Sequence, residues 1–150
     1  MSAPILEATR RRSAALVARD ADAYARVAAA YKLPADTPEL ESMKKRTVDE
    51  ALLAAAAVPL ETAAACAEVA ELALAVAERG NTNAASDAGI AALLAEAGCV
   101  GASYNVRINV AALGDPARGA ALADDARRLV ERTRELARRT ADVVERTLGP

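Results

Sequence analysis

The residue types and spacings that could support chemistry are concentrated in residues 80–110. Asp87 and Asn105 are eighteen residues apart, which is five full turns of an α-helix, so both side chains lie on one helix face. The same face carries further small or polar residues, namely Gly98, Gly101 and Asn109. Each glycine inside a helix costs about 1 kcal/mol relative to alanine. The close approach of a ligand or of another backbone would compensate for that cost.

Asp87 and Asn105 are too far apart to serve one reacting centre on a single helix. At 1.5 Å per residue they are separated by about 27 Å along the axis. Either they form two subsites for a long ligand, or a second subunit brings them together. Both also have structural explanations. Asp87 would be a first-turn carboxylate that interacts with the helix dipole, and Asn105 and Asn109 would form hydrogen bonds between helices.

The absence of histidine limits the available chemistry. The chain has no His, and its two cysteines, Cys66 and Cys99, lie in alanine-rich surroundings without a pattern of metal ligands. Ser-His and Cys-His nucleophilic schemes are therefore excluded. We expect two small buried thiols, no metal site, and chemistry carried by Asp, Glu, Lys, Tyr or substrate atoms.

The composition is that of one soluble globular domain. The 150 residues are 53% hydrophobic and 27% charged, with a net charge of -2. The longest uncharged stretches, residues 51–60 and 97–106, are much shorter than the ~20 residues that cross a bilayer. At the N-terminus the arginine cluster follows the short apolar stretch, which is the wrong order for a secretory signal. We expect a cytoplasmic protein with no membrane partner.

Helical periodicity covers almost the whole chain and predicts an all-α bundle of four to five long antiparallel helices. We expect helices over residues 5–31, 39–79, 86–112 and 116–148. Pro59 either kinks the second helix or begins a new one, because its ring removes a donor and clashes with the preceding turn. Gly80 suits a helix C-terminus, and Asn83 or Ser86 suits the N-cap of the following helix.

The last predicted helix has a seven-residue repeat of large apolar residues, formed by Leu122, Leu129, Leu136 and Val143. This repeat predicts a seam for packing within the bundle or between subunits. Residues 115–146 hold eight arginines and seven acidic residues, so the segment carries a net charge of only +1. Phosphate binding needs an uncompensated basic stripe, so we expect a solvated face with ion pairs and no nucleic-acid partner.

Three stretches together resemble a known family. Residues 80–113 read GNTNAASDAGIAALLAEAGCVGASYNVRINVAAL, which is similar to the signature of the formiminotransferase-cyclodeaminase family. Residues 20–24 with 30–34, and residues 57–61, are similar to the same family in the same order. The resemblance covers most of the chain, from about Leu16 to Leu148.

The resemblance implies an all-helical domain that dimerises and binds a tetrahydrofolate near the subunit interface. It also implies one of two reactions, formimidoyltetrahydrofolate cyclodeamination or methenyltetrahydrofolate cyclohydrolysis. Both make or break a C–N bond at an amidine-like carbon. Such an enzyme moves protons and stabilises positive charge without a bound redox cofactor or metal.

Matching the family residue by residue gives candidate catalytic groups. Asp87, in the SDAG stretch, is the first candidate for the acid or base, because a carboxylate would also favour the cationic methenyl form. Asp20 and Tyr24, one turn apart, are a second candidate pair, Asp20 as the catalytic group and Tyr24 as a binding group. Their structural alternative is a buried polar contact across helices.

The same match gives candidate binding groups. Lys32 would face the folate carboxylates or remain on a solvated loop. Arg107 would meet a glutamate tail or a partner helix. Hydrogen bonds to a pteridine edge would come from Asn81, Asn83 and Ser86, although helix capping explains these three equally well. Asn105 and Asn109 complete the predicted substrate-binding residues.

The chain departs from the family pattern at its N-terminus. Family members usually begin with a further helical segment that carries a PGGGS-like motif, and this motif is absent from residues 1–150. We therefore interpret residues 1–150 as a single cyclodeaminase-like domain that lacks a glycine-rich wall of the usual folate site. A truncated chain, a mis-called start or a natural short form with altered chemistry would each look like this.

Three hypotheses follow from the pattern and the departure. We favour an active folate cyclodeaminase or cyclohydrolase, because the candidate residues of the family pattern are present. The second hypothesis is a related enzyme that acts on a different amidine-like substrate. The third is a noncatalytic helical dimer for which the seam of the last helix is the working surface.

Overall fold

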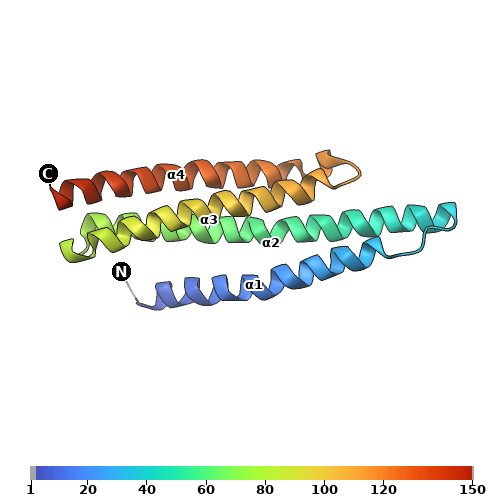
Figure 1. Ribbon diagram of the computed structural model, residues 1–150, viewed down its shortest axis with the longest axis horizontal. Coiled ribbons are helices and arrows are strands. Elements are labelled where there is room, and N and C mark those ends of the chain that lie inside the picture. The colour runs from blue at the N-terminus through green and yellow to red at the C-terminus, as the bar shows by residue number, and fades with distance from the viewer. Residues whose placement is uncertain (1–2, 150) are drawn as a thin grey trace.

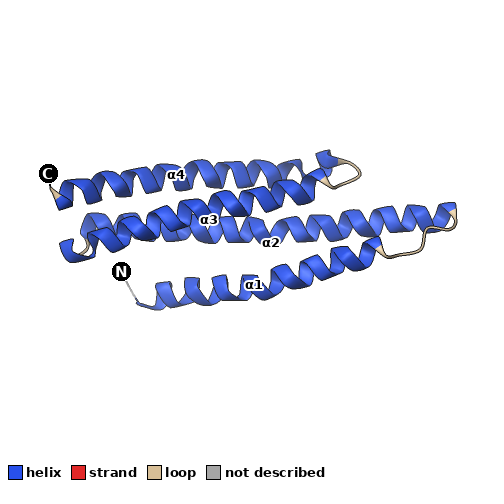
Figure 2. Cartoon of the chain, viewed as in Figure 1, coloured by secondary structure: helices blue, strands red, loops and turns tan. Residues whose placement is uncertain are grey.

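The computed structural model describes residues 3–149 as four long helices (Figure 1). They are α1 (Ala3–Tyr31), α2 (Pro38–Arg79), α3 (Ala85–Ala111) and α4 (Ala120–Leu148). Two 3-10 turns, η1 (Thr82–Ala84) and η2 (Pro116–Gly119), precede α3 and α4. No strand occurs in the part of the chain that the structure describes (Figure 2). The predicted all-α bundle is confirmed, with four long helices.

The helix boundaries are close to those expected from the sequence. Thr37 accepts a hydrogen bond from the backbone amide of Leu40 at 3.3 Å, and Pro38 occupies the first turn of α2. Pro59 is buried inside α2, which continues past it as one helix to Arg79. Of the two alternatives for Pro59, the structure excludes a new helix at this residue.

Two local predictions were wrong. Neither Asn83 nor Ser86 is the N-cap of α3, because Ala84 occupies that position without a side-chain hydrogen bond. Asn81 instead accepts from the backbone amide of Asn83 at 3.0 Å and caps the 3-10 turn η1. The last α-helix begins at Ala120 rather than at Pro116, since residues 116–119 form the tighter turn η2.

Short connections make each helix antiparallel to the next, so α1 and α3 run parallel (Figure 1). The central helix α2 packs against the other three. Small side chains dominate the core and allow close approach of the helices; fully buried examples are Ala56, Ala63, Ala70, Cys99, Val106 and Ala126. The helix α1 is attached to α2 by the buried Leu16 and by the ion pairs Arg12–Glu68 and Arg19–Glu61.

The predicted seam of α4 packs within the chain. Its fully buried positions are occupied by the smaller residues, namely Ala126, Val130, Thr133, Ala137, Thr140 and Val144. Leu129 and Leu136 are only half-buried and flank this line. Thr133 and Thr140 satisfy their hydroxyl groups by donating to the carbonyls of Leu129 and Leu136 at 2.7 and 2.8 Å. The large apolar residues of the predicted seam are therefore half-buried beside the intramolecular core, and packing of the seam between subunits stays a prediction.

The solvent side of α4 carries arginines that are paired with carboxylates. The pairs are Arg127–Asp124, Arg128–Asp125, Arg132–Glu71, Arg134–Glu96, Arg138 with Glu135 and Asp142, and Arg139–Glu78. This pattern agrees with the expected ion-paired face.

Two helical stretches, Pro38–Arg79 and Thr82–Ala111, are long and apolar enough to cross a bilayer when only length and composition are considered. In their most apolar windows 44% and 28% of the residues are buried inside the bundle. The expectation that the chain has no membrane partner stays a prediction.

Candidate functional site: a groove between two parallel helices

A groove follows the space between α1 and α3, with α2 beneath it. It consists of two cavities that share the lining residue Ser13 of α1. The first, which we call the Asp87 cavity, has a volume of about 370 Å³, and the second, the Asp20 cavity, about 360 Å³. Each lies within the range of small-molecule sites in proteins, about 300–1,000 Å³. The groove is the feature of the bundle best suited to a long ligand.

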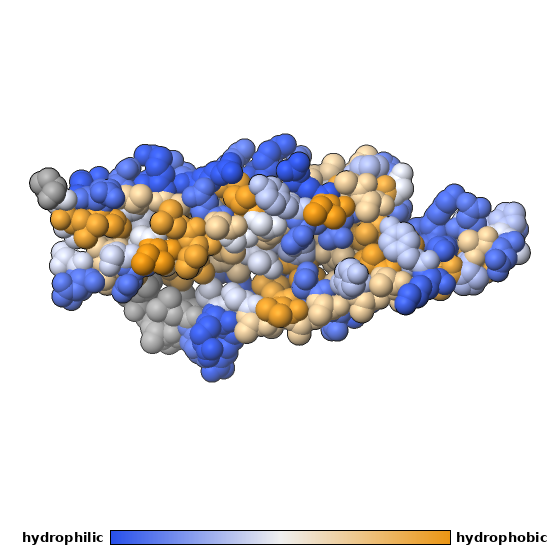
Figure 3. Space-filling view, viewed as in Figure 1, coloured by the Kyte–Doolittle hydropathy of each residue, from blue (hydrophilic) through white to orange (hydrophobic). Residues whose placement is uncertain are grey.

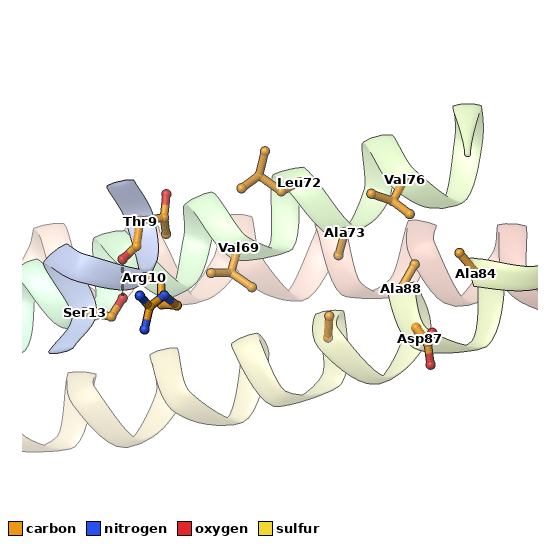
Figure 4. Close-up of a pocket in the computed structure, with 11 residues that line it drawn as sticks. Thr9, Arg10, Ser13, Val69, Leu72, Ala73, Val76, Ala84, Asp87 and Ala88 are labelled. Atoms are coloured by element: carbon orange, nitrogen blue, oxygen red, sulfur yellow. Dashed lines mark hydrogen bonds between the residues drawn. The ribbon is translucent and has the colours of Figure 1, made fainter. Parts of the chain in front are cut away.

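The Asp87 cavity combines apolar walls with a few polar groups (Figure 4). Val69, Leu72 and Val76 of α2 form one wall, and Ala88 and Ala91 of α3 extend the apolar lining. The side chain of Asp87 lies at the end where α3 begins, while Thr9, Arg10 and Ser13 of α1 lie at the other end (Figure 4).

Asp87 itself is an exposed carboxylate in the first turn of α3. No ion pair or side-chain hydrogen bond holds it among the described residues. Its position fits the structural explanation, an interaction with the helix dipole, and it also leaves both oxygens available to a ligand in the cavity. A carboxylate that faces an apolar cavity can accept or return a proton at a bound substrate.

The Asp20 cavity brings together residues from two of the predicted groups. It is lined by Asp20 of α1 and by the face of α3 that contains Gly98, Gly101 and Asn105. Asp20 and Asn105 belong to elements far apart in sequence, and the parallel arrangement of α1 and α3 places them at one cavity. Asp87 and Asn105 both face the groove but line different cavities, as their spacing along one helix requires.

The two central glycines of α3, Gly98 and Gly101, have different surroundings. A Cβ atom at Gly98 would lie 3.0 Å from the Sγ of Cys66 on α2, which is closer than an ordinary van der Waals contact, so the glycine accommodates this side chain. A Cβ atom at Gly101 would meet nothing within 4 Å. Packing within the chain does not explain Gly101, which lines the Asp20 cavity.

Several predicted residues lie outside both cavities. Tyr24 is 76% exposed, and Asp20, although it lines a cavity, is also exposed, so the alternative of a buried polar contact across helices is wrong for both. Lys32 and Arg107 are exposed as well. The amide of Asn109 donates to the carbonyls of Asn105 at 3.1 Å and of Ala55 at 3.4 Å. Asn109 thus has the structural role of linking α3 to α2.

The polar residues at the α2–α3 connection are exposed and close to the Asp87 end of the groove. Asn81, Asn83 and Ser86 are exposed, and Ala84 in the same segment lines the Asp87 cavity. Of the three, Asn81 uses its side chain to cap η1. The side chains of Asn83 and Ser86 donate and accept no hydrogen bond among the described residues.

Sequence reasoning missed the contribution of Thr9, Arg10 and Ser13 to the groove. The spacing of these residues along α1 could have revealed their contribution. Ser13 precedes Asp20 by seven residues, which places both on one face of α1, and Thr9 and Arg10 precede Ser13 by four and three residues. That face could be assigned to the groove only once the position of α1 against α2 was known.

The two thiols lie in the core between α2, α3 and α4. Cys99 is buried, as expected, and Cys66 is half-buried. Burial raises the pKa of both thiols, and the neighbouring Cys99 raises the pKa of Cys66 further. Residues 3–149 contain no group of three or more potential metal ligands. Neither thiol is placed for nucleophilic or metal chemistry.

A larger cavity of about 690 Å³ lies at the opposite end of the bundle. Most of its charged groups are already engaged with one another: Arg118 pairs with Asp49 at 2.6 Å and Lys45 with Glu41 at 2.9 Å. The Asp49 carboxylate also accepts from the backbone amide of Gly114 at 3.0 Å. The Asp49 contacts join α2 to the connection between α3 and α4, and together with the Lys45–Glu41 pair within α2 they leave few groups for a ligand.

The fold and the groove define an all-helical domain with an elongated candidate site that carries carboxylates on two parallel helices. The model of the formiminotransferase-cyclodeaminase family matches residues 2–128, so the chain belongs to this family. The matched residues include every residue named above as lining the two cavities. The resemblance seen in the sequence is confirmed.

Individual relatives are similar over about three quarters of this chain. A methenyltetrahydrofolate cyclohydrolase of Methylorubrum extorquens is 42% identical over 111 residues, covering 74% of this chain and 53% of the relative. A formimidoyltransferase-cyclodeaminase of Rattus norvegicus is 35% identical over 112 residues, covering 75% of this chain and 21% of the relative. The chain therefore spans about half the length of the first relative and a smaller part of the second.

A solved structure shows the same fold. The crystal structure of a formiminotetrahydrofolate cyclodeaminase from Thermotoga maritima matches with a TM-score of 0.84 and 24% sequence identity. The match covers 97% of this chain and 69% of the other. The four-helix arrangement is thus a fold that already occurs in the family.

Proposed function

We propose that this protein is a folate one-carbon enzyme, a formimidoyltetrahydrofolate cyclodeaminase or methenyltetrahydrofolate cyclohydrolase. The observation that carries the proposal is Asp87, a carboxylate without a partner among the described residues, at the end of an apolar cavity within the family-matched part of the chain. The names of the relatives support the substrate class, since they describe a cyclohydrolase and a cyclodeaminase that act on tetrahydrofolates.

Asp87 would act as the base and then as the acid in either reaction. In cyclohydrolysis, the carboxylate accepts a proton from water as the water oxygen adds to the methenyl carbon. The proton then goes to the leaving nitrogen as the C–N bond breaks, and the formyl product forms with release of one proton to solvent. In cyclodeamination, the folate amine adds to the carbon of the protonated formimino group, and the carboxylate takes the proton of that amine. It then gives the proton to the departing nitrogen, so that the C–N bond breaks, ammonia leaves and the cationic methenyl bridge closes.

The surroundings of Asp87 favour these steps. The apolar walls formed by Val69, Leu72 and Val76 reduce the local dielectric constant and strengthen the attraction between the carboxylate and a cationic methenyl group. Neither reaction changes the oxidation state of the one-carbon unit. We therefore infer that the chemistry needs proton transfer and charge stabilisation, and no bound redox cofactor.

The Asp20 cavity offers a second carboxylate with the amide-bearing Asn105. Because Asp87 and Asn105 are about 27 Å apart along α3, the reacting carbon of one folate cannot reach both. We assign the reaction to Asp87, because its cavity has the apolar walls that suit the planar rings of a folate. Asp20 and Asn105 would bind a more distant part of a long substrate.

We also propose that the protein acts as a homodimer through a ridge on α3. The ridge consists of Ile90, Leu94, Tyr104 and Ile108, whose exposed fractions are between 55% and 68%. Ala97 and Gly101 fill the intervening positions, so the six residues alternate at spacings of four and three, which suits packing against another helix. Figure 3 shows apolar side chains gathered over α3 on this face. A cytoplasmic location without nucleic-acid or membrane partners completes the proposal.

The purified chain can be tested with methenyltetrahydrofolate by following the near-ultraviolet absorbance of the methenyl bridge. Accelerated decay over the buffer rate would support the cyclohydrolase. Formation of that absorbance from formimidoyltetrahydrofolate, with release of ammonia, would support the cyclodeaminase. If neither absorbance change exceeds the buffer rate while circular dichroism shows folded protein, the proposed function is wrong.

A further inference from the structure

The Asp87 cavity has opposite charges at its two ends. The carboxylate of Asp87 lies where α3 begins, and the guanidinium-bearing Arg10 of α1 lies at the other end (Figure 4). Between them the lining is almost entirely apolar and includes Val69, Leu72 and Val76. Such a cavity suits a ligand with a cationic or protonatable group at one end, an apolar middle and an anionic group at the other.

The length of the cavity can be estimated from the helix that forms its wall. Val69 and Val76 are seven residues apart on α2, which corresponds to about 10 Å along the axis. In a tetrahydrofolate, the nitrogen that carries the one-carbon unit is joined through a benzoyl ring and an amide to a glutamate. Standard bond lengths place the α-carboxylate about 10 Å from that nitrogen.

We propose that Arg10 binds the α-carboxylate of the substrate's glutamate, with the benzoyl ring along the apolar wall and the reacting carbon at Asp87. This assignment of Arg10 rests on the proposed function and adds the direction in which the substrate lies in the groove. The pteridine would then extend past Asp87 toward the connection that contains Asn83 and Ser86, whose side chains are exposed there.

The charge around Arg10 suits this role. Glu7 accepts two hydrogen bonds from Arg10, at 3.0 and 2.9 Å, and one from Arg11 at 2.8 Å, so one carboxylate is shared by two guanidinium groups and a substrate carboxylate would replace it on Arg10. The hydrogen bonds from Arg10 and then Arg11 lower the pKa of Glu7, so this carboxylate stays ionised at neutral pH. One positive charge remains in excess. A substrate carboxylate can bind Arg10 while Glu7 keeps its contact with Arg11.

Arg10 is the cationic group that lines this end of the cavity, and the Ser13 hydroxyl proton does not compete with it for an anion. Ser13 donates its hydroxyl proton to the carbonyl of Thr9 at 2.9 Å, so that proton is already used within α1. The next arginine, Arg12, is directed to α2, where it pairs with Glu68 at 2.5 Å.

The test compares two substrates and two matched variants. Turnover is measured with methenyltetrahydrofolate and with methenyltetrahydropteroate, which lacks the glutamate, for the wild type, Arg10→Gln and Arg26→Gln. We expect Arg10→Gln to raise KM for the folate about tenfold with kcat retained, because one charge-assisted hydrogen-bonded contact is lost. The same variant should leave KM for the pteroate unchanged. Arg26→Gln removes an equal charge from an exposed position of the same helix that lines neither cavity of the groove, and it should change neither KM.

An equal rise of KM for both substrates in Arg10→Gln, or an equal effect of Arg26→Gln, would overturn the assignment while the folate activity stands. If no turnover is found, so that the proposed function fails, the role of Arg10 is tested by measuring ligand binding directly. Calorimetry with p-aminobenzoylglutamate and p-aminobenzamide should then show a preference for the glutamate compound that Arg10→Gln abolishes. No such preference in the wild type would overturn the role of Arg10.

Discussion

At the scale of single residues, α3 contains both structural and functional positions that look alike in sequence. Gly98 and Gly101 lie on one predicted face, and only the structure separates them. Gly98 permits the approach of Cys66, whereas Gly101 borders open space. Asn105 and Asn109 separate in the same way, because Asn109 bonds to α2 and Asn105 lines the Asp20 cavity. Residue type and helical spacing predicted that these residues share one face of α3. They could not predict which of them contact α2 and which line a cavity.

The contact at Gly98 gives a stability prediction. Gly98→Ala gains about 1 kcal/mol of helix propensity but places a Cβ 3.0 Å from the Cys66 Sγ, so we expect a net loss of stability of about 1 kcal/mol in urea unfolding. In a Cys66→Ala background the same substitution should become stabilising relative to that background. An identical effect of Gly98→Ala in both backgrounds would contradict the contact.

The thiols give a reactivity prediction. Burial raises the pKa of Cys66 and Cys99, which lowers their thiolate fraction at a given pH. We expect both to react with iodoacetamide near pH 8 more slowly in the folded protein than in urea, with rates that rise as the pH increases. Mass spectrometry of the modified peptides measures this. If Cys99 in the folded protein reacted as fast as it does in urea, the burial of Cys99 between α3 and α4 would be contradicted.

At the scale of elements, the hydrophobic period predicted each helix, and the errors fell at the helix ends. The predicted N-cap of α3 was wrong because the chain first forms a 3-10 turn capped by Asn81. The sequence pattern does not distinguish such a turn from the start of an α-helix. The groove was not predictable from any one helix. It arises from the position of α1 on α2, which depends on Leu16 and on the ion pairs from Arg12 and Arg19.

The connection between α3 and α4 depends on one carboxylate of α2. Asp49 accepts from the backbone amide of Gly114 and pairs with Arg118. We expect Asp49→Ala to lower the free energy of unfolding by about 1 kcal/mol, since a backbone donor and a guanidinium both lose their acceptor. The neighbouring Glu50→Ala, an exposed residue without an ion pair among those described, is the control and should have little effect. Equal unfolding midpoints for the two variants would contradict this role of Asp49.

At the scale of the whole molecule, the surface for a second copy follows from what the chain leaves uncovered. The large apolar residues of the α4 seam are half-buried against the rest of the chain, while those of the α3 ridge, namely Ile90, Leu94, Tyr104 and Ile108, are exposed. We predict that Leu94→Glu shifts the protein from dimer to monomer in light scattering, because a carboxylate would be buried in the interface. Leu148→Glu, a similarly exposed leucine away from the ridge, should leave the mass unchanged. A monomeric wild type, or a dimer that survives Leu94→Glu, would rule out the ridge as the interface.

The assignment of the reaction to Asp87 is tested most directly by two isosteric variants in the methenyltetrahydrofolate assay. Asp87→Asn and Asp20→Asn each remove one exposed carboxylate from the groove and preserve its shape. We predict that Asp87→Asn lowers kcat at least about 100-fold, as expected for loss of a general acid-base group, while Asp20→Asn retains most of kcat. Retention of turnover by Asp87→Asn together with its loss in Asp20→Asn would place the reacting centre in the other cavity and contradict the assignment.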